Sequence, residues 1–339
     1  MENFNQSPVT CKKKKRIVFI DIDKAICIIL VVIGHYVPDN SPAWYVALHD
    51  IIYTFHMPLF MFASGYVYIA TKKDVAYGTV LWKKVRRLMI PYISTSFIVI
   101  TIKLITQGSL SVDAPVTFLS YLKMFYSPEA GAFLWFIWAL WWMFVIVPLF
   151  KTKQSRLLLF LACLIIHYVP VHVTDIFCFA SVKNMFVFFM LGIIAFENNT
   201  LHRFVNDFSL RKSVVAIALF FVAQSVNLTF GGGILVTILL PYIGIFFILE
   251  ISKLICHYHE VSKESVMLLV AASSYIIYLF HTTFEGFAKA VCRRLPLDSD
   301  LWYVFVPEAI VVITCGLVVP IILFKVFKRY KFTRMLFGL

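Results

Sequence analysis

The chain has 339 residues, of which 61% are hydrophobic and only 14% charged, and its formal net charge is +13. A soluble domain is roughly half apolar and about a quarter charged, so this composition excludes a soluble globular protein and indicates a polytopic membrane protein. The seven cysteines form no C-x-x-C pair, and this spacing argues against a disulfide framework or a zinc site.

Apolar segments of roughly 17–25 residues, the length that crosses a bilayer, recur along the chain. They predict an all-α bundle of ten transmembrane helices, at about residues 20–39, 46–70, 87–106, 134–150, 157–173, 176–196, 213–230, 232–254, 266–290 and 303–324. The chain then divides into a basic N-terminal segment (1–19), a membrane domain (20–327) and a basic tail (328–339). No internal repeat is visible.

Lys and Arg residues predict the orientation, because they gather in alternate connections between the expected spans. One side of the membrane then receives most of these residues: Lys12–Lys15, Arg16, Lys72, Lys73, Lys83, Lys84, Arg86, Arg87, Lys151, Lys153, Arg156, Arg203, Arg211, Lys212, Lys253, Lys263, Lys325, Lys328, Arg329, Lys331 and Arg334. The other side has Lys123, Arg293 and Arg294, with Lys103 near the end of a span. The positive-inside rule therefore predicts two cytoplasmic termini. A basic inner rim facing anionic lipids accounts for the net charge without nucleic acid as a partner.

The first expected span carries charges at its start and a histidine at its end. Lys24 and His35 are eleven residues apart, which is three helical turns and ~16 Å, so both side chains lie on nearly the same face. His56, in the second span, reaches a similar depth from the opposite direction. An ionisable side chain at that depth is a functional-site hypothesis by default. We expect the two imidazoles to share a cavity; the alternative is two histidines hydrogen-bonded to the backbone and packed in the bundle.

Other polar groups in the spans have two interpretations each. Ser64 and Gly65 form a small-residue notch, which suits helix packing more readily than catalysis. Arg86 and Arg87 suit either the membrane interface or phosphate binding. Trp135 begins a stripe at i, i+3 and i+7, as an aromatic belt or a packed helix face does.

The ninth expected span carries Ser274, Tyr278 and His281 along one helix face. Polar groups on a lipid-embedded helix are expected to face the bundle interior or water. Packing and ligand binding are equally good explanations for these three side chains.

Five motifs together resemble the type 3 membrane acyltransferases, and within them the fucose 4-O-acetylase-like branch. They are Asp21-x-x-Lys24 with Gly34-His35; Phe55-His-Met-Pro-Leu-Phe with Ser64-Gly-Tyr66; Arg87-Leu-x-x-Pro91-Tyr; Leu134-Trp-Phe; and Ser274-Tyr-x-x-Tyr278-x-x-His281. They follow the order of that family over nearly the whole chain. The first two together are specific, whereas the last two are weak alone.

The resemblance implies a ten-helix enzyme of the bacterial inner membrane that moves an acyl group, usually acetyl, from acyl-CoA to a hydroxyl of a glycan or a lipid-linked saccharide. Acetyl-CoA is then a co-substrate, and no bound cofactor or metal is expected. The family's proposed catalytic histidine corresponds to His35, and its basic residue to Lys24, where many relatives carry Arg. Some relatives have a carboxylate in the fourth span, where this chain has Ala139, Leu140 and Trp141.

Residues and resemblance together give a mechanistic hypothesis. Lys24, Arg86 and Arg87 bind the phosphates of acyl-CoA. His35, assisted by His56, acts as a general base or transiently carries the acyl group.

The remaining candidates support these steps: Tyr278 and His281 orient the acceptor, and the supporting group also includes Asp21, Ser64, Trp135 and Ser274. The main alternative function is export of a glycan or lipid-linked intermediate, against which the missing repeat counts. A scaffold in a polysaccharide-synthesis complex is the third interpretation.

Overall fold

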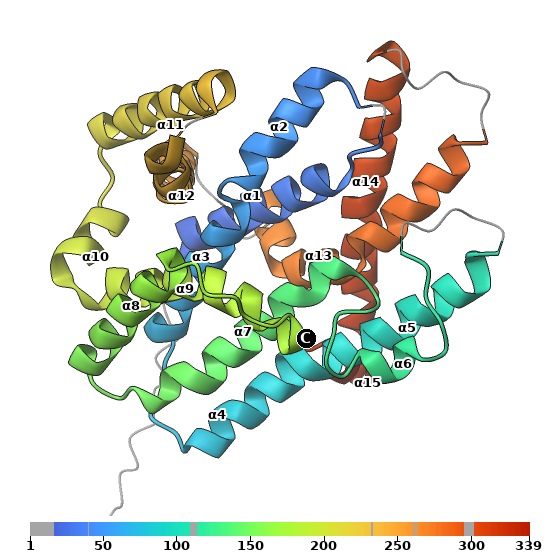
Figure 1. The fold of residues 1–339 in the computed structure, drawn as a ribbon, viewed down its shortest axis with the longest axis horizontal. Coiled ribbons are helices and arrows are strands. Elements are labelled where there is room, and N and C mark those ends of the chain that lie inside the picture. Colours follow the sequence, from blue (N-terminus) through green and yellow to red (C-terminus); the bar gives the residue numbers. More distant parts are fainter. Residues whose placement is uncertain are drawn as a thin grey trace, which may run out of the picture.

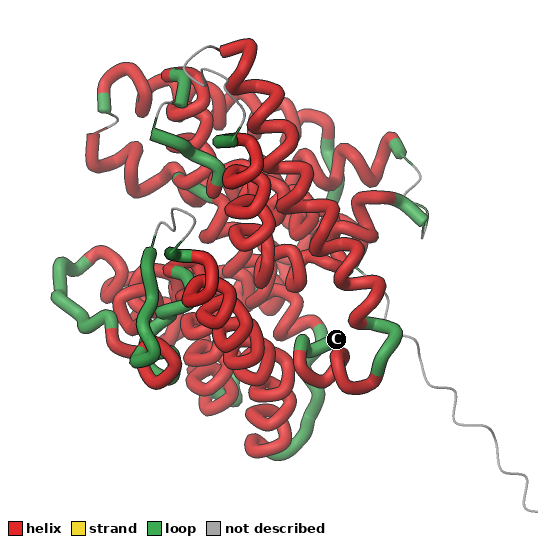
Figure 2. Tube along the Cα trace, turned by 90° about the vertical axis from the view of Figure 1, so that its right-hand side faces the viewer, coloured by secondary structure: helices red, strands yellow, loops and turns green. Residues whose placement is uncertain are grey.

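A computed structural model describes residues 17–39, 41–108, 114–231, 233–259, 262, 264–294 and 302–339. The regular secondary structure in these ranges is entirely helical, and Figures 1 and 2 show helices and loops but no strand in them. The predicted all-α class is therefore confirmed. The basic residues Lys12–Lys15, Arg16 and Lys263, and residues 109–113 of the loop between the third and fourth expected spans, lie outside the described residues.

The helices follow one another along the chain with mostly short connections. The α-helices are α1 Val18–His35, α2 Ala43–Tyr53, α3 His56–Ala70, α4 Tyr77–Lys84, α5 Ile90–Thr106, α6 Ser120–Lys123, α7 Trp135–Ile146, α8 Lys153–Tyr168, α9 Phe179–Glu197, α10 Asn199–Asn206, α11 Leu210–Phe230, α12 Gly233–Tyr258, α13 Val266–Cys292, α14 Trp302–Phe327 and α15 Lys331–Leu336. Four short segments of tighter or wider helix join them: η1 Val85–Met89, η2 Ala132–Leu134, η3 Val147–Leu149 and η4 Ile176–Cys178.

Eight helical stretches in the described part of the chain are long and apolar enough to cross a membrane. They coincide with eight of the ten expected spans, so a multi-pass membrane protein is confirmed. The two others are the helices α1 and α8. The first carries three charges, at Asp21, Asp23 and Lys24, and the second has only 16 residues. The count of ten spans and the cytoplasmic location of both termini stay predictions.

The second expected span is two helices rather than one, with a break at Thr54 and Phe55. Pro58 explains the break, because it has no N–H to donate to the carbonyl of Thr54 four residues earlier. Phe55 fills the break by packing on Gly244 of α12, where an added Cβ would lie 2.2 Å from the Phe55 Cβ. As a result His56 is the first residue of α3 and not a residue within a continuous helix.

The helices α3 and α9 approach each other at their backbones. A Cβ on Gly65 would lie 1.9 Å from the Phe189 carbonyl oxygen, and a Cβ on Gly192 would lie 2.1 Å from that of Phe62. Small residues that let two membrane helices pack this closely are expected at the helix–helix interfaces of such bundles. The notch at Gly65 is therefore a packing feature.

A Gly65→Ala substitution is expected to lower the stability of the fold by about 3 kcal/mol, because the new methyl group must displace backbone atoms. Thermal denaturation in detergent, read as the loss of the monodisperse peak in gel filtration, measures the effect. Gly286→Ala is the matched control, since a Cβ at Gly286 meets no atom within 4 Å. Equal melting of the two variants would contradict the prediction.

Candidate active site

His35 stands at the last residue of α1 among aromatic rings from three other elements. Its ring centroid lies 5.0 Å from that of His281 in α13, 6.0 Å from that of Phe133 in η2 and 6.4 Å from that of Tyr53 in α2. His281 is fully buried. The imidazole of His35 is thus held in place by ring contacts from helices far apart in the sequence.

Backbone hydrogen bonds fix the tautomers of the other two histidines. His56 Nδ1 lies 2.8 Å from the Ile52 carbonyl oxygen, and His281 Nδ1 lies 2.9 Å from that of Tyr278. A carbonyl oxygen can only accept, so each neutral ring carries its proton on Nδ1 and has a lone pair at Nε2. The Nε2 atom of His281 is buried and has no hydrogen-bond partner among the described residues. Its lone pair is therefore available to accept a hydrogen bond from a ring N–H of its neighbour His35.

A cavity of about 570 Å³, which we call the polar chamber, has His35 and His56 in its wall. Its lining is Val31, His35, Tyr53, Thr54, His56, Met57, Pro58, Ala132, Phe133, Trp135, His167, Asn184, Met185, Phe188, Asn227, Thr237, Leu240, Pro241 and Tyr278. The shared cavity is the arrangement that the matching depth of His35 and His56 predicts. Trp135 and Tyr278, two of the other candidates, lie in the same wall.

A second cavity of about 320 Å³, the small chamber, reaches His35 from the side of α5 and α13. It is lined by His35, Val99, Ile102, Lys103, Thr106, Ala114, Ala130, Gly131, Ala132, Phe133, Thr282, Thr283, Gly286, Phe287 and Ala290. Besides His35, both chambers share Ala132 and Phe133. The hydroxyl of Tyr278 donates to the carbonyl oxygen of Phe133 and so ties η2 to α13.

The ring of Phe133 folds back over Gly131. A Cβ at Gly131 would lie 2.5 Å from the Phe133 Cε1 atom. Glycine at this position therefore leaves the space in which the ring lies between the two chambers beside His35.

The third cavity, about 890 Å³, lies at the ends of α3 and α7 and we call it the basic basin. Its lining is Tyr68, Thr71, Lys72, Lys73, Asp74, Val75, Ala76, Tyr77, Val80, Lys83, Lys84, Arg86, Arg87, Pro148 and Lys151. The candidates Arg86 and Arg87 are thus brought together with five lysines and one carboxylate. Lys24 is not in this wall; it pairs with Asp21 at 3.6 Å on α1.

The two arginines of the basic basin lie in η1, a π-helical turn between α4 and α5. Such turns are frequent at functional sites, because the wider ring leaves carbonyls free of the α pattern. Here the Leu88 carbonyl accepts from the hydroxyl of Tyr275 at 3.4 Å. The segment after α15 packs on the same turn, since a Cβ on Gly338 would lie 2.9 Å from the Arg87 carbonyl oxygen, and Figure 1 shows α15 beside α5.

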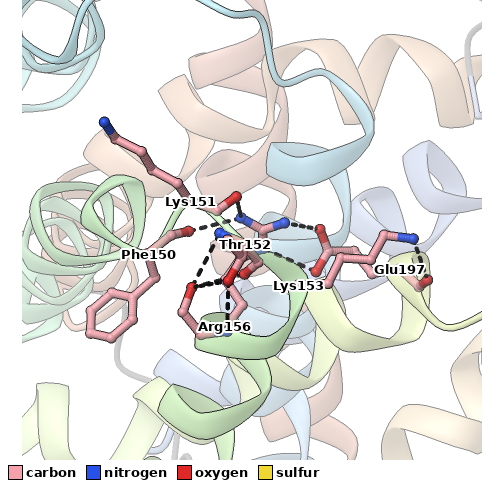
Figure 3. Close-up of polar contacts among 7 residues, drawn as sticks. Phe150, Lys151, Thr152, Lys153, Arg156 and Glu197 are labelled. Carbon is pink, nitrogen blue, oxygen red and sulfur yellow. Dashed lines mark hydrogen bonds and ion pairs between the residues drawn. The ribbon is translucent and has the colours of Figure 1, made fainter.

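A buried ion pair holds the loop that brings Lys151 into the basic basin. The Arg156 guanidinium binds both carboxylate oxygens of Glu197 and also donates to the carbonyls of Phe150 and Lys151, each at 2.8 Å. Figure 3 shows the Lys151 side chain directed away from this network. The pair therefore fixes the backbone from which Lys151 projects.

Removing this ion pair is expected to be costly. Arg156→Ala leaves Glu197 largely buried without its partner, which typically costs about 3 kcal/mol or more. We expect a lower melting temperature in detergent and a weaker affinity for polyanions in the basic basin. Arg156→Lys should lose part of this stability, because an ammonium group cannot bind the carboxylate and two carbonyls in a planar fork. An Arg156→Ala protein that melts like the wild type would contradict the prediction.

Five candidates line none of the three cavities: Asp21, Lys24, Ser64, Ser274 and His281. Ser274 donates to the Ala271 carbonyl at 2.9 Å, as a packed helix serine does.

Several wall residues are not among the sequence candidates. His167, Asn184 and Asn227 line the polar chamber from α8, α9 and α11. Polar side chains in apolar spans are a signal for such residues, but it does not reveal which of them meet. The sequence predicts the lysines of the basic basin only as part of the basic rim and does not indicate that they line a cavity.

The sequence is similar to known acyltransferases over most of its length. The sequence profile of the acyltransferase domain matches residues 17–325. The Nodulation protein NolL of Sinorhizobium fredii is 26% identical over 61% of this chain and 56% of its own length. The Nodulation protein NolL of Mesorhizobium japonicum is 24% identical over 59% of this chain and 54% of its own length. The chain thus spans about half the length of these curated relatives. No solved structure matches it.

Proposed function

Because the chain belongs to the type 3 acyltransferase family, we propose that it moves an acyl group, acetyl from acetyl-CoA, to a hydroxyl of a cell-surface glycan or its lipid-linked precursor in a bacterial inner membrane. One observation carries the proposal: His35 stands in the wall of a polar cavity, beside a histidine whose Nε2 is free to accept a hydrogen bond from it. An imidazole is neutral near pH 7 and suits proton transfer as well as acyl transfer.

The basic basin is the proposed site of the nucleotide part of the donor. Arginine binds phosphate through two parallel hydrogen bonds, and Arg86 and Arg87 lie in one wall with five lysines. Coenzyme A carries several phosphate charges, which such a cluster neutralises. Lys24, outside this wall, stays a candidate from the sequence alone.

One route uses His35 as a general base. A ring nitrogen of His35 takes the proton of the acceptor hydroxyl, while the oxygen of that hydroxyl attacks the thioester carbonyl. The C–S bond breaks, and the imidazolium returns the proton to the departing thiolate. The products are the ester and the thiol of coenzyme A.

The other route uses His35 as a carrier. A ring nitrogen attacks the thioester carbonyl, the C–S bond breaks, and the proton on the other ring nitrogen passes to the thiolate. The acceptor hydroxyl then attacks the acyl-imidazole and leaves its proton on the ring. In both routes the second ring nitrogen of His35 carries a proton, and a neighbouring acceptor for that N–H takes a second role, in which it orients the ring and stabilises its charged form.

His281 suits that second role better than direct contact with an acceptor, since it is fully buried and lines neither chamber. Two imidazoles joined by an N–H···N bond of about 2.9 Å have centroids roughly 5 Å apart. The rings of His35 and His281 are 5.0 Å apart.

Release of free thiol from acetyl-CoA by the purified protein tests the proposal. Wild type is compared with His35→Ala, with and without a glycan extract of the source cells. Acceptor-dependent release that the variant lacks supports the enzyme. Movement of a glycan across vesicle membranes without thiol release would favour the exporter instead.

A further inference from the structure

The wall of the polar chamber contains neutral side chains only. No Asp, Glu, Lys or Arg is among its lining residues, whereas the basic basin has seven cations. An ionised ligand in the chamber would lose its hydration without gaining a counter-charge, and such a loss is strongly unfavourable. The two cavities are therefore built for ligands of different charge.

The polar groups of this wall match a ligand rich in hydroxyl groups. Asn184 and Asn227 have amides that can donate and accept, Tyr53 has a hydroxyl, and the Thr237 hydroxyl, which donates to the Gly233 carbonyl, can still accept. A sugar hydroxyl also both donates and accepts, so each can be paired. These groups come from four different helices, α9, α11, α12 and α2.

Aromatic rings provide the remaining surface. Trp135, Phe188 and Phe133 line the chamber together with Tyr53 and Tyr278. Sugar rings have apolar C–H faces, which pack on aromatic faces while their hydroxyls bond to polar groups at the edge. The volume of about 570 Å³ lies in the range of small-ligand sites and holds roughly one or two sugar rings.

We propose that the polar chamber is the acceptor site and that the hydroxyl acylated there belongs to an uncharged sugar unit. The inference rests on the proposed function and specifies its acceptor. His35 in the chamber wall lies where that hydroxyl reaches it, and the fixed Nε2 lone pair of His56 accepts from a second hydroxyl. Sugars with a carboxylate or phosphate on this unit are excluded.

The small chamber is the competing location. It also reaches His35, and Lys103 in its wall would suit an anionic acceptor. Gly286→Leu narrows the small chamber, since a side chain there meets no nearby atom at its Cβ. Asn184→Leu and Asn227→Leu change the polar chamber by removing its amides at nearly constant volume.

The first experiment divides a glycan extract on an anion exchanger into neutral and acidic fractions and supplies radiolabelled acetyl-CoA. We expect ester label in the neutral fraction, at least 100-fold above the acidic fraction. Asn227→Leu should raise the KM for the neutral fraction at least tenfold and leave that for acetyl-CoA unchanged, whereas Gly286→Leu should behave as wild type. Label in the acidic fraction, or loss of transfer in Gly286→Leu alone, would overturn the inference.

A binding experiment keeps this inference separate from the proposed chemistry. Thr237→Cys in the His35→Ala background introduces a thiol in the exposed part of the chamber wall, and a maleimide reports its access against the same background without the new thiol. Protection by the neutral fraction supports the acceptor site whether or not thiol release occurs. Protection by the acidic fraction, or by neither, counts against it. Absence of thiol release with intact protection counts only against the acyltransferase proposal.

Discussion

His35→Ala is expected to reduce acyl transfer at least ~10³-fold, because general-base catalysis alone contributes 10²–10⁴-fold and no other imidazole lies at the meeting of the two chambers in the described part of the chain. Thiol release from acetyl-CoA in the presence of acceptor is the measurement. The variant should still insert and fold, since the interactions that the His35 side chain loses are contacts with neighbouring rings.

The control for His35→Ala is His172→Ala, which removes an exposed imidazole that lines none of the three cavities. It should retain wild-type activity. A His35→Ala protein that runs as a monodisperse peak in gel filtration and keeps more than a tenth of the wild-type rate would contradict the mechanism.

Trapping of an acylated enzyme distinguishes the carrier route from the general-base route. If His35 carries the acyl group, radiolabelled acetyl-CoA without acceptor leaves protein-bound label that hydroxylamine releases. If His35 is only a base, no such label forms and transfer is still lost in His35→Ala. His281→Leu removes the acceptor for the His35 N–H, so the rate should fall while the KM for acetyl-CoA stays unchanged, and His281→Gln, whose carbonyl oxygen can still accept, should keep more of the rate.

The double substitution Arg86→Ala and Arg87→Ala is expected to raise the KM for acetyl-CoA about 100-fold. Hydrogen bonds to charged groups contribute roughly 1.5–3 kcal/mol each, and two arginines of the basin are lost at once. The rate at saturating acetyl-CoA should change much less, because neither residue lies beside His35. Steady-state kinetics at several salt concentrations measure both quantities.

Salt provides a second signature for the arginine variant. The wild-type KM should rise with ionic strength, and the double variant should be less sensitive, because it has fewer charges to screen. Lys328→Ala with Arg329→Ala is the matched control: it removes the same charge on the same predicted membrane side, outside the basic basin. If this control raises the KM as much as the arginine variant, the effect comes from surface charge and not from a site.

Local patterns account for the parts of the fold that the sequence predicts well. Apolar length determines where helices form, whereas the direction that the charges at their ends predict stays a prediction. The break before His56 was missed because an apolar run looks continuous, although Pro58 marks it. The expected third span starts at 87, yet helix extends from Tyr77 through the π-turn, since basic residues next to a span look like a loop on a hydropathy scale.

The site is harder to predict because it is assembled from distant segments. His35, His56, Tyr278 and Trp135 meet in one wall as the motifs lead one to expect, yet Asn184 and Asn227 join them from helices with no motif of their own. Lys24, three turns below His35 on the same helix face, points to a donor site on α1, whereas the clustered cations lie at α3, α4 and α7. Depth along one helix can be counted from the sequence, but the lateral neighbours of that helix depend on packing.

The contact between Gly131 and the ring of Phe133 has a consequence for how homologous sequences diverge. A side chain at 131 occupies the space of that ring, so a relative with a larger residue there must have a smaller one at 133. The two positions should therefore covary across an alignment, and pairs that break the rule should be rare. Relatives with small residues at both positions would have a single joined chamber beside the histidine, and we expect them to act on bulkier acceptors.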